Sequence, residues 1–177
     1  YRRQRQMCIR DSFREMGCDI SQCWQSKSMM KFDFTLTEKK RIEIKSTLKS
    51  NRIHHFKHDQ LQSELYDIRI VSMMLQKSDV GLSLGDLIEK INDIYPTDYP
   101  LLMHIESLVS HVDREHLFEA KYDPGYIKAH LRYYNAVDIP HFNEKTPDGV
   151  FNAEYDCALD TAETTSQDAI IAWIREE

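Results

Sequence analysis

Two carboxylates and one ammonium group fall on neighbouring strand patterns in the first third of the chain. Apolar and polar residues alternate in Lys31–Leu36 and again in Arg41–Ser46, which is typical of β-strands. Successive side chains of a strand point to opposite faces, so Glu43 and Lys45 share one face. The polar stretch between the two patterns has the length of a hairpin connection, and an antiparallel turn there brings Asp33 opposite that face. The pattern therefore predicts that all three groups lie together.

Such a set of side chains is suited to phosphodiester hydrolysis. This reaction needs a water made nucleophilic near neutral pH and positive charge at the phosphate, and hard divalent metals supply both. Mg²⁺ takes oxygen ligands and usually only one or two protein carboxylates, which matches Asp33 and Glu43. Lys45 would orient the attacking water or stabilise the negative charge of the transition state. An isolated Glu-x-Lys pair is more often a solvated salt pair, so the flanking sequence has to decide.

The flanking sequence resembles a PD-(D/E)XK nuclease family, with Asp33 as the D and Glu43-Ile44-Lys45 as the E-x-K. This family is found in prokaryotic defence islands, beside restriction and helicase genes, and the similarity runs from about residue 24 to about residue 159. The features that carry it, in order, are Phe32-Asp33-Phe34, Ile42 to Thr47, His54-His55-Phe56, Gln60-Leu61, the strand pattern from Leu65 to Leu75, and the helix start Ser83 to Leu87.

The resemblance implies a restriction-endonuclease-like α/β fold, in which a mixed sheet bears Asp33, Glu43 and Lys45 and is flanked by helices. It implies Mg²⁺ or Mn²⁺ held by Asp33, Glu43 and the carbonyl group of Ile44. It assigns catalysis to Asp33, Glu43 and Lys45, with Gln60 as a helper. The implied activity is DNA cleavage in a restriction or phage-defence system, with a helicase, ATPase or methyltransferase partner. A homodimer is a further expectation, because cutting two strands needs two sites.

Basic residues gather around the second strand pattern, although the chain as a whole has a formal net charge of −6. Residues 38–58 hold seven lysines and arginines against two glutamates. Cationic groups of this kind hold DNA phosphates by salt-sensitive contacts that read no sequence. The predicted DNA contacts are Lys39, Lys40, Arg41, Lys49, Arg52, His54, His55 and Lys57. For the histidines, phosphate or surface roles are preferred to zinc binding, because no ligand spacing supports a zinc site.

The remaining sequence predicts one globular domain behind an unusual N-terminus. The 177 residues, 41% of them hydrophobic, are enough to bury a core. Residues 1–12, YRRQRQMCIRDS, look like a translated sequencing adapter; a natural basic tail is the alternative. We therefore expect a non-native tail over residues 1–12 and a truncated nuclease-like domain over residues 13–177.

Several further elements follow from local patterns. Gly17 is expected to end a short helical turn, and a continuous apolar run predicts a buried central strand at Asp67–Gln76. Helices are expected at Leu84–Ile94, with Ser83 as N-cap, at Leu101–Val112 and at Ala169–Ile174. Two late strand patterns, Tyr126–Val137 and Val150–Leu159, predict a C-terminal β-pair.

The composition also bounds the location and the function class. No run approaches the 18 or so apolar residues of a membrane span, and the N-terminus lacks the apolar region of a signal peptide. Four cysteines without a pattern predict reduced thiols in a cytoplasmic protein. Two alternatives to a DNA endonuclease stay open: a non-catalytic subunit that uses the same fold to bind DNA or partner proteins, and a nuclease that acts on RNA.

Overall fold

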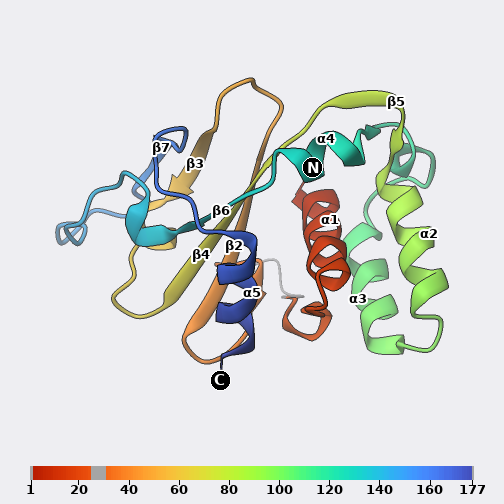
Figure 1. The fold of residues 1–177 in the computed structure, drawn as a ribbon, viewed down its shortest axis with the longest axis horizontal. Coiled ribbons are helices and arrows are strands. Elements are labelled where there is room, and N and C mark those ends of the chain that lie inside the picture. Colours follow the sequence, from red (N-terminus) through yellow and green to blue (C-terminus); the bar gives the residue numbers. More distant parts are fainter. Residues whose placement is uncertain (1, 25–30, 177) are drawn as a thin grey trace.

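The computed structural model describes residues 2–24 and 31–176 and shows an α/β domain built in layers (Figure 1). The central sheet has the strand order β1-β2-β4-β6, in which β2 and β4 are parallel and both edge strands are antiparallel to their neighbours. A second sheet pairs β3 with β7 in antiparallel fashion. The strands are β1 (Phe34–Thr35), β2 (Lys40–Thr47), β3 (Ile53–Lys57), β4 (Asp67–Met74), β5 (Lys77–Leu82), β6 (Arg132–Asn135) and β7 (Glu154–Ala158).

Helices flank the central sheet, as predicted. α1 packs on one face, and α2 and α3 lie beyond it, while α5 lies near the start of β2 (Figure 1). The helices are α1 (Arg2–Glu15), α2 (Leu84–Ile94), α3 (Tyr99–Val109), α4 (Pro124–Ala129) and α5 (Gln167–Arg175). Short 3₁₀ turns are η1 (Ser21–Cys23), η2 (His58–Gln60), η3 (Glu115–Leu117) and η4 (Ala136–Asp138). None of the helices in the described ranges is long and apolar enough to cross a membrane.

Two hydrophobic cores lie on opposite faces of the central sheet. Ile42 and Ile44 of β2 belong to the larger core, together with residues of α1, α2 and α3. The smaller core lies between the two sheets and includes Phe56 of β3 and Ile70 of β4. Because strand side chains alternate, the residues of β2 next to the isoleucines point to the second sheet. The polar face of β2 is therefore an interior face.

Local chemistry explains the elements that the sequence predicted well. At the start of α2, Ser83 Oγ accepts from the backbone N–H of Asp86 at 3.1 Å, and an Asp86 carboxylate oxygen accepts from the N–H of Ser83 at 2.7 Å. This reciprocal capping satisfies two N–H groups that a helix start leaves without partners. The predicted central strand is β4, which lies between β2 and β6. The predicted last helix is α5.

Residues 2–12 of the predicted non-native tail belong to α1, and residue 1 lies outside the described residues. Met7 and Ile9 are fully buried, and Phe13 of the same helix is buried with them. The helix ends where Gly17 adopts a φ of 79° and the N–H of Cys18 donates to the Phe13 carbonyl group, which confirms the predicted cap. The segment is thus part of the core of this structure, and its adapter origin stays a prediction.

The predicted C-terminal β-pair is wrong. β6 pairs with β4, and β7 pairs with β3, so the two late strands lie in different sheets. The first half of the predicted strand Tyr126–Val137 is α4 instead, because Asp123 caps this helix by accepting from the N–H of Tyr126 at 3.0 Å and Pro124 occupies its first turn. The sequence also left β5 unpredicted. A strand pattern shows that a strand forms, but its partner depends on which sheet edge is open.

Candidate active site

The β1–β2 hairpin places Asp33 beside Glu43. Phe34 is paired with Ile42, so the residue before Phe34 comes opposite the residue after Ile42. A carboxylate oxygen of Asp33, Oδ2, accepts from the N–H of Ile44 at 2.9 Å. The N–H and C=O groups of one strand residue point to the same edge, so the Ile44 carbonyl group faces the side where Asp33 lies. The three predicted metal ligands are therefore neighbours.

Glu43 and Lys45 form a buried ion pair on the polar face of β2. The ammonium nitrogen of Lys45 lies 3.0 Å from Glu43 Oε1 and donates to Gln60 Oε1 at 2.8 Å. It also lies 4.7 Å from the centre of the Phe56 ring, at a cation–π distance. The four residues predicted to be catalytic thus meet at one place, and their catalytic roles stay predictions.

Gln60 reaches Lys45 because η2 follows β3 without a break. Its side-chain oxygen also accepts from the backbone N–H of Lys57 at 3.2 Å, and its amide nitrogen donates to the carbonyl group of Lys31 at 3.2 Å. These two contacts hold the side chain in one orientation. The ammonium group of Lys45 therefore has a fixed neutral acceptor as well as a carboxylate.

Burial controls the protonation of this pair. Asp33, Glu43 and Lys45 are only 1%, 2% and 9% exposed. Desolvation, followed by repulsion from Asp33, raises the pKa of Glu43 to about 7. Desolvation also lowers the pKa of Lys45, while the Glu43 carboxylate opposes this effect. A bound cation would favour the ionised form of Glu43, because opposite charge lowers the pKa of a carboxyl group.

One oxygen of Glu43 fits a metal ligand. Oε2 is buried and has no hydrogen-bond partner among the described residues, and such an orphaned atom is costly unless something satisfies it. Together with the Asp33 carboxylate and the Ile44 carbonyl group it makes an all-oxygen donor set, which Mg²⁺ and Mn²⁺ prefer. Side chains alone do not complete a site, because the described ranges contain no group of three or more His, Cys, Asp or Glu that could hold a metal. The residues present fit a hard divalent cation that also uses a backbone carbonyl group.

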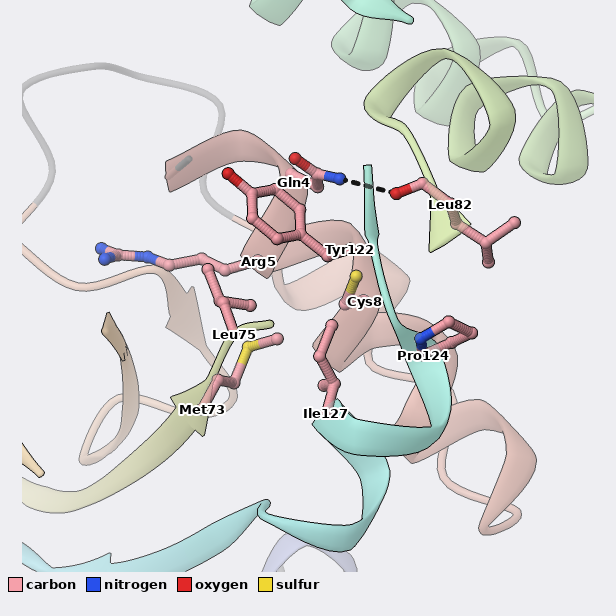
Figure 2. A pocket seen from close by; sticks show the side chains of 9 residues that line it. All are labelled: Gln4, Arg5, Cys8, Met73, Leu75, Leu82, Tyr122, Pro124 and Ile127. Carbon is pink, nitrogen blue, oxygen red and sulfur yellow. Dashed lines mark hydrogen bonds between the residues drawn. The ribbon is translucent and has the colours of Figure 1, made fainter. Parts of the chain in front are cut away.

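α1 closes the site on the side of Asp33. Gln6 Nε2 donates to Asp33 Oδ1 at 2.5 Å, and Arg5 Nη2 lies 3.9 Å from Asp33 Oδ2. In Figure 2, Arg5 extends away from α1 in one direction, whereas Gln4 reaches the other way to the Leu82 carbonyl group at 3.1 Å. A cavity of about 20 Å³, enough for about one water, is lined by Gln4, Arg5 and Leu82 among others, but not by Gln6 or Asp33 (Figure 2). Sequence reasoning missed both contacts with Asp33, because it set residues 1–12 aside as a tail.

Two of the predicted DNA contacts are interior residues. Arg52 and His54 are buried, and the guanidinium group of Arg52 donates to Ser72 O at 3.3 Å, to Ser72 Oγ at 2.8 Å and to the His130 carbonyl group. In β3 the inward residues alternate with outward ones, so His54 faces the central sheet while its neighbour His55 faces solvent. The expectation of direct phosphate contact is corrected for Arg52 and His54, because no DNA backbone reaches a buried, satisfied group.

Two further basic residues are tied to the protein backbone. Lys40 Nζ donates to the carbonyl groups of Trp173 at 2.7 Å and Glu176 at 2.5 Å, at the C-terminal end of α5. Arg41 Nη1 donates to the Thr37 carbonyl group at 2.6 Å, within the hairpin turn. Both side chains therefore have a structural function, and DNA contact stays a prediction for them.

The other predicted contacts are exposed but dispersed. His55 lies against two carboxylates of β7, whose hydrogen bonds raise the pKa of its imidazole. Lys39 and Lys49 are exposed near opposite ends of β2. At about 3.3 Å per strand residue, they are separated by roughly 30 Å. Lys57 is exposed at the end of β3. The basic segment thus does not form one continuous surface, and DNA contact by these residues stays a prediction.

A comparison with known protein families identifies the family to which the chain belongs. Residues 11–160 match a family described as "Putative PD-(D/E)XK family member, (DUF4420)". The chain belongs to this family, which confirms the predicted family and its restriction-endonuclease-like fold class. The matched range includes Asp33, Glu43, Lys45 and Gln60. No curated protein and no solved structure shows a significant match to the chain.

Proposed function

We propose that this chain is the nuclease domain of a metal-dependent DNA endonuclease of a prokaryotic restriction or phage-defence system. The observation that carries the proposal is the meeting of Asp33, Glu43 and Lys45, with Glu43 Oε2 buried and without a partner among the described residues. A purely structural ion pair needs neither a second carboxylate nor an orphaned oxygen. Membership of a nuclease-like family supports the same activity class.

In the proposed reaction, Asp33 and Glu43 would hold Mg²⁺ or Mn²⁺ through carboxylate oxygens, with the Ile44 carbonyl group as a third ligand. When bound, the ion supplies a more acidic water and compensates charge at the phosphate. Lys45 donates hydrogen bonds towards the attacking water and the phosphate oxygens. Gln60 and Glu43 keep its ammonium group at the metal-binding face.

Access to the proposed site requires a change at α1. A phosphate group cannot approach Asp33 while Gln6 donates to its Oδ1 and both residues are buried. We therefore include release of the Gln6 contact in the proposed substrate-binding step. Exposed Lys39, Lys49 and Lys57 are the phosphate contacts that we retain from the basic segment.

The biological setting rests on the resemblance of the motif order in this sequence to that of defence-island nucleases. We include DNA as the substrate, a cytoplasmic location, a homodimer for double-strand cleavage, and a helicase, ATPase or methyltransferase partner. The second candidate is a non-catalytic subunit that binds DNA or a partner protein on the same fold. The observation that supports this second candidate is the burial of the three site residues.

Metal binding is the first test. Isothermal titration of Mg²⁺ and Mn²⁺ into the whole chain should show binding that weakens at least about tenfold in Asp33→Ala, because a charged oxygen ligand is lost. Asp79→Ala, which removes an exposed aspartate of β5, is the matched control and should bind as the wild type does. Absence of binding at millimolar metal, with or without DNA, would favour the non-catalytic subunit.

Cleavage is the second test. Supercoiled plasmid should be nicked in Mg²⁺ by the wild type, and Lys45→Ala should lower the rate by about 10²–10³-fold, as expected for a lost electrostatic group. Lys77→Ala removes an exposed lysine at the start of β5, which has no part in the proposed site, and should keep nearly full activity. Equal nicking by wild type and Lys45→Ala would exclude a catalytic function for Lys45.

A further inference from the structure

His54 and Ser72 make a buried contact beside Lys45 that the proposed reaction does not use. His54 Nε2 lies 2.8 Å from Ser72 Oγ. Ser72 is the register partner of Lys45 on the neighbouring parallel strand. Ser72 is fully buried and His54 is 3% exposed. The imidazole therefore lies only one side chain away from the lysine of the site.

Arg52 determines which ring nitrogen of His54 carries the proton. Its Nη1 donates to Ser72 Oγ at 2.8 Å, and a guanidinium group can only donate. Among the described residues, the only other hydrogen-bond partner of Ser72 Oγ is His54 Nε2, so the hydroxyl group accepts from Arg52 and its own hydrogen is directed to His54 Nε2. Since Nε2 is then an acceptor, the neutral ring keeps its proton on Nδ1.

The surroundings oppose a second proton on this ring. A proton on Nε2 would point at the hydroxyl hydrogen of Ser72. It would also add a positive charge near Lys45 of β2, Arg52 next to β3 and Arg5 of α1, so burial and these cations lower the pKa of His54 to about 4. From β7, the register partner is Cys157, and burial raises the pKa of its thiol, so this side supplies no negative charge.

We propose that Arg52 and Ser72 lock His54 as a neutral imidazole protonated on Nδ1, and that His54 is a positioning residue for Lys45. A neutral ring fills the layer between β3 and β2 without adding another cation there. A charged ring would repel the ammonium group of Lys45. The consequence for catalysis rests on the proposed function. The fixed neutral tautomer of His54, which we call the lock, does not depend on whether the chain cleaves DNA.

Long-range ¹H–¹⁵N NMR of the imidazole rings in the whole, metal-free chain tests the lock directly. The signals of His54 are identified among the eight histidines by their loss in His54→Gln. We expect the Nδ1-protonated neutral pattern from about pH 5.5 to about pH 8, across the range in which an ordinary histidine titrates. A ring protonated on Nε2, or a ring that titrates with an ordinary midpoint, would overturn the proposal.

Variants of Ser72 separate the lock from burial alone. Ser72→Ala removes the hydroxyl donor, so His54 should change tautomer or titrate at a midpoint raised by about one pH unit or more. Ser72→Thr keeps the hydroxyl group and should keep the wild-type pattern. If Ser72→Ala behaves like the wild type, burial and not the hydrogen-bond chain sets the tautomer, and the lock is refuted. If Ser72→Ala does not fold, the wild-type spectrum still decides.

The catalytic consequence has its own readout. In plasmid cleavage, Ser72→Ala should lose activity at about pH 5 relative to about pH 8 more than the wild type does, because His54 then becomes charged beside Lys45. Adding His54→Gln, which keeps an acceptor near position 72 but cannot titrate, should remove this extra loss. A wild type that shows the locked tautomer but no cleavage would refute the proposed function and leave the lock intact. Identical pH profiles for all variants would refute the positioning of Lys45 by His54.

Discussion

The two faces of β2 are equally buried but differ in what burial does for them. Ile42 and Ile44 face α1 in an apolar core, whereas Glu43 and Lys45 face β3 as an ion pair. Removing apolar surface from water stabilises the fold by about 25 cal/mol per Å². Removing charges from water costs free energy, and pairing them repays this cost only in part. The same strand therefore gains stability on one face and loses it on the other.

The difference indicates where function is to be sought. A buried pair that leaves one Glu43 oxygen without a partner among the described residues is weak support for stability. Strongly perturbed protonation in such a group is more typical of functional sites. Substitutions on the apolar face should therefore change stability, and substitutions on the polar face should change ligand binding.

The largest effect on stability is expected at Ile44. Ile44→Ala should lower the free energy of unfolding by about 2–5 kcal/mol, because it removes buried methyl and methylene groups and leaves a cavity. Glu43→Gln, one position away on the other face, should change it by less than about 1 kcal/mol, because a neutral amide of similar shape replaces a carboxyl group that is costly to ionise. Urea denaturation at about pH 5, where Glu43 is protonated in the folded chain, measures both. A loss at Glu43→Gln as large as that at Ile44→Ala would show that the polar face is structural.

The next effect is a dependence of stability on pH. The pKa of Glu43 is raised from its ordinary value of 4.5 to about 7, so the folded chain binds more protons than the unfolded chain between these values. The stabilisation is fully present below the unfolded pKa and is lost as the pH rises through the folded pKa. Between about pH 5 and about pH 8 the metal-free wild type should lose up to about 3 kcal/mol relative to Glu43→Gln. Parallel stability curves for the two chains would show that Glu43 is not perturbed.

The smallest effect is expected at the contact between α1 and Asp33. Gln6→Ala removes the donor on Asp33 Oδ1 and should tighten Mn²⁺ binding by about three- to tenfold, because the ion no longer competes with that hydrogen bond. Gln4→Ala is the matched control, since Gln4 is a buried glutamine of the same helix that donates to the Leu82 carbonyl group instead. Isothermal titration measures both. Weaker binding in Gln6→Ala would show that Gln6 orients Asp33 for the metal.

The part of the site that was predictable depends on local patterns. Alternation around Glu43 and Lys45, and the polar turn before them, were sufficient to predict the hairpin that carries Asp33. The signal for α4 was also present, because an aspartate followed by proline is a typical helix start, but the apolar residues after it were interpreted as a strand. The contacts of Gln6 with Asp33 and of Arg52 with Ser72 span 27 and 20 residues, and no local pattern encodes such distances.

The sequence by itself determined which residues of β2 share a face and that a carboxylate from the preceding strand joins them, because side-chain alternation and turn length are local properties of the chain. Only the tertiary structure decided that this face is interior. This face of β2 is covered by β3, and β3 pairs with β7. In that pairing His55 lies opposite Asp156, which is 101 residues away in the sequence. The burial of Glu43 and Lys45, the raised pKa of Glu43 and the hydrogen bonds that link Arg52, Ser72 and His54 all follow from that pairing. The reason is that desolvation depends on what is packed against a group in space and not on its neighbours in sequence.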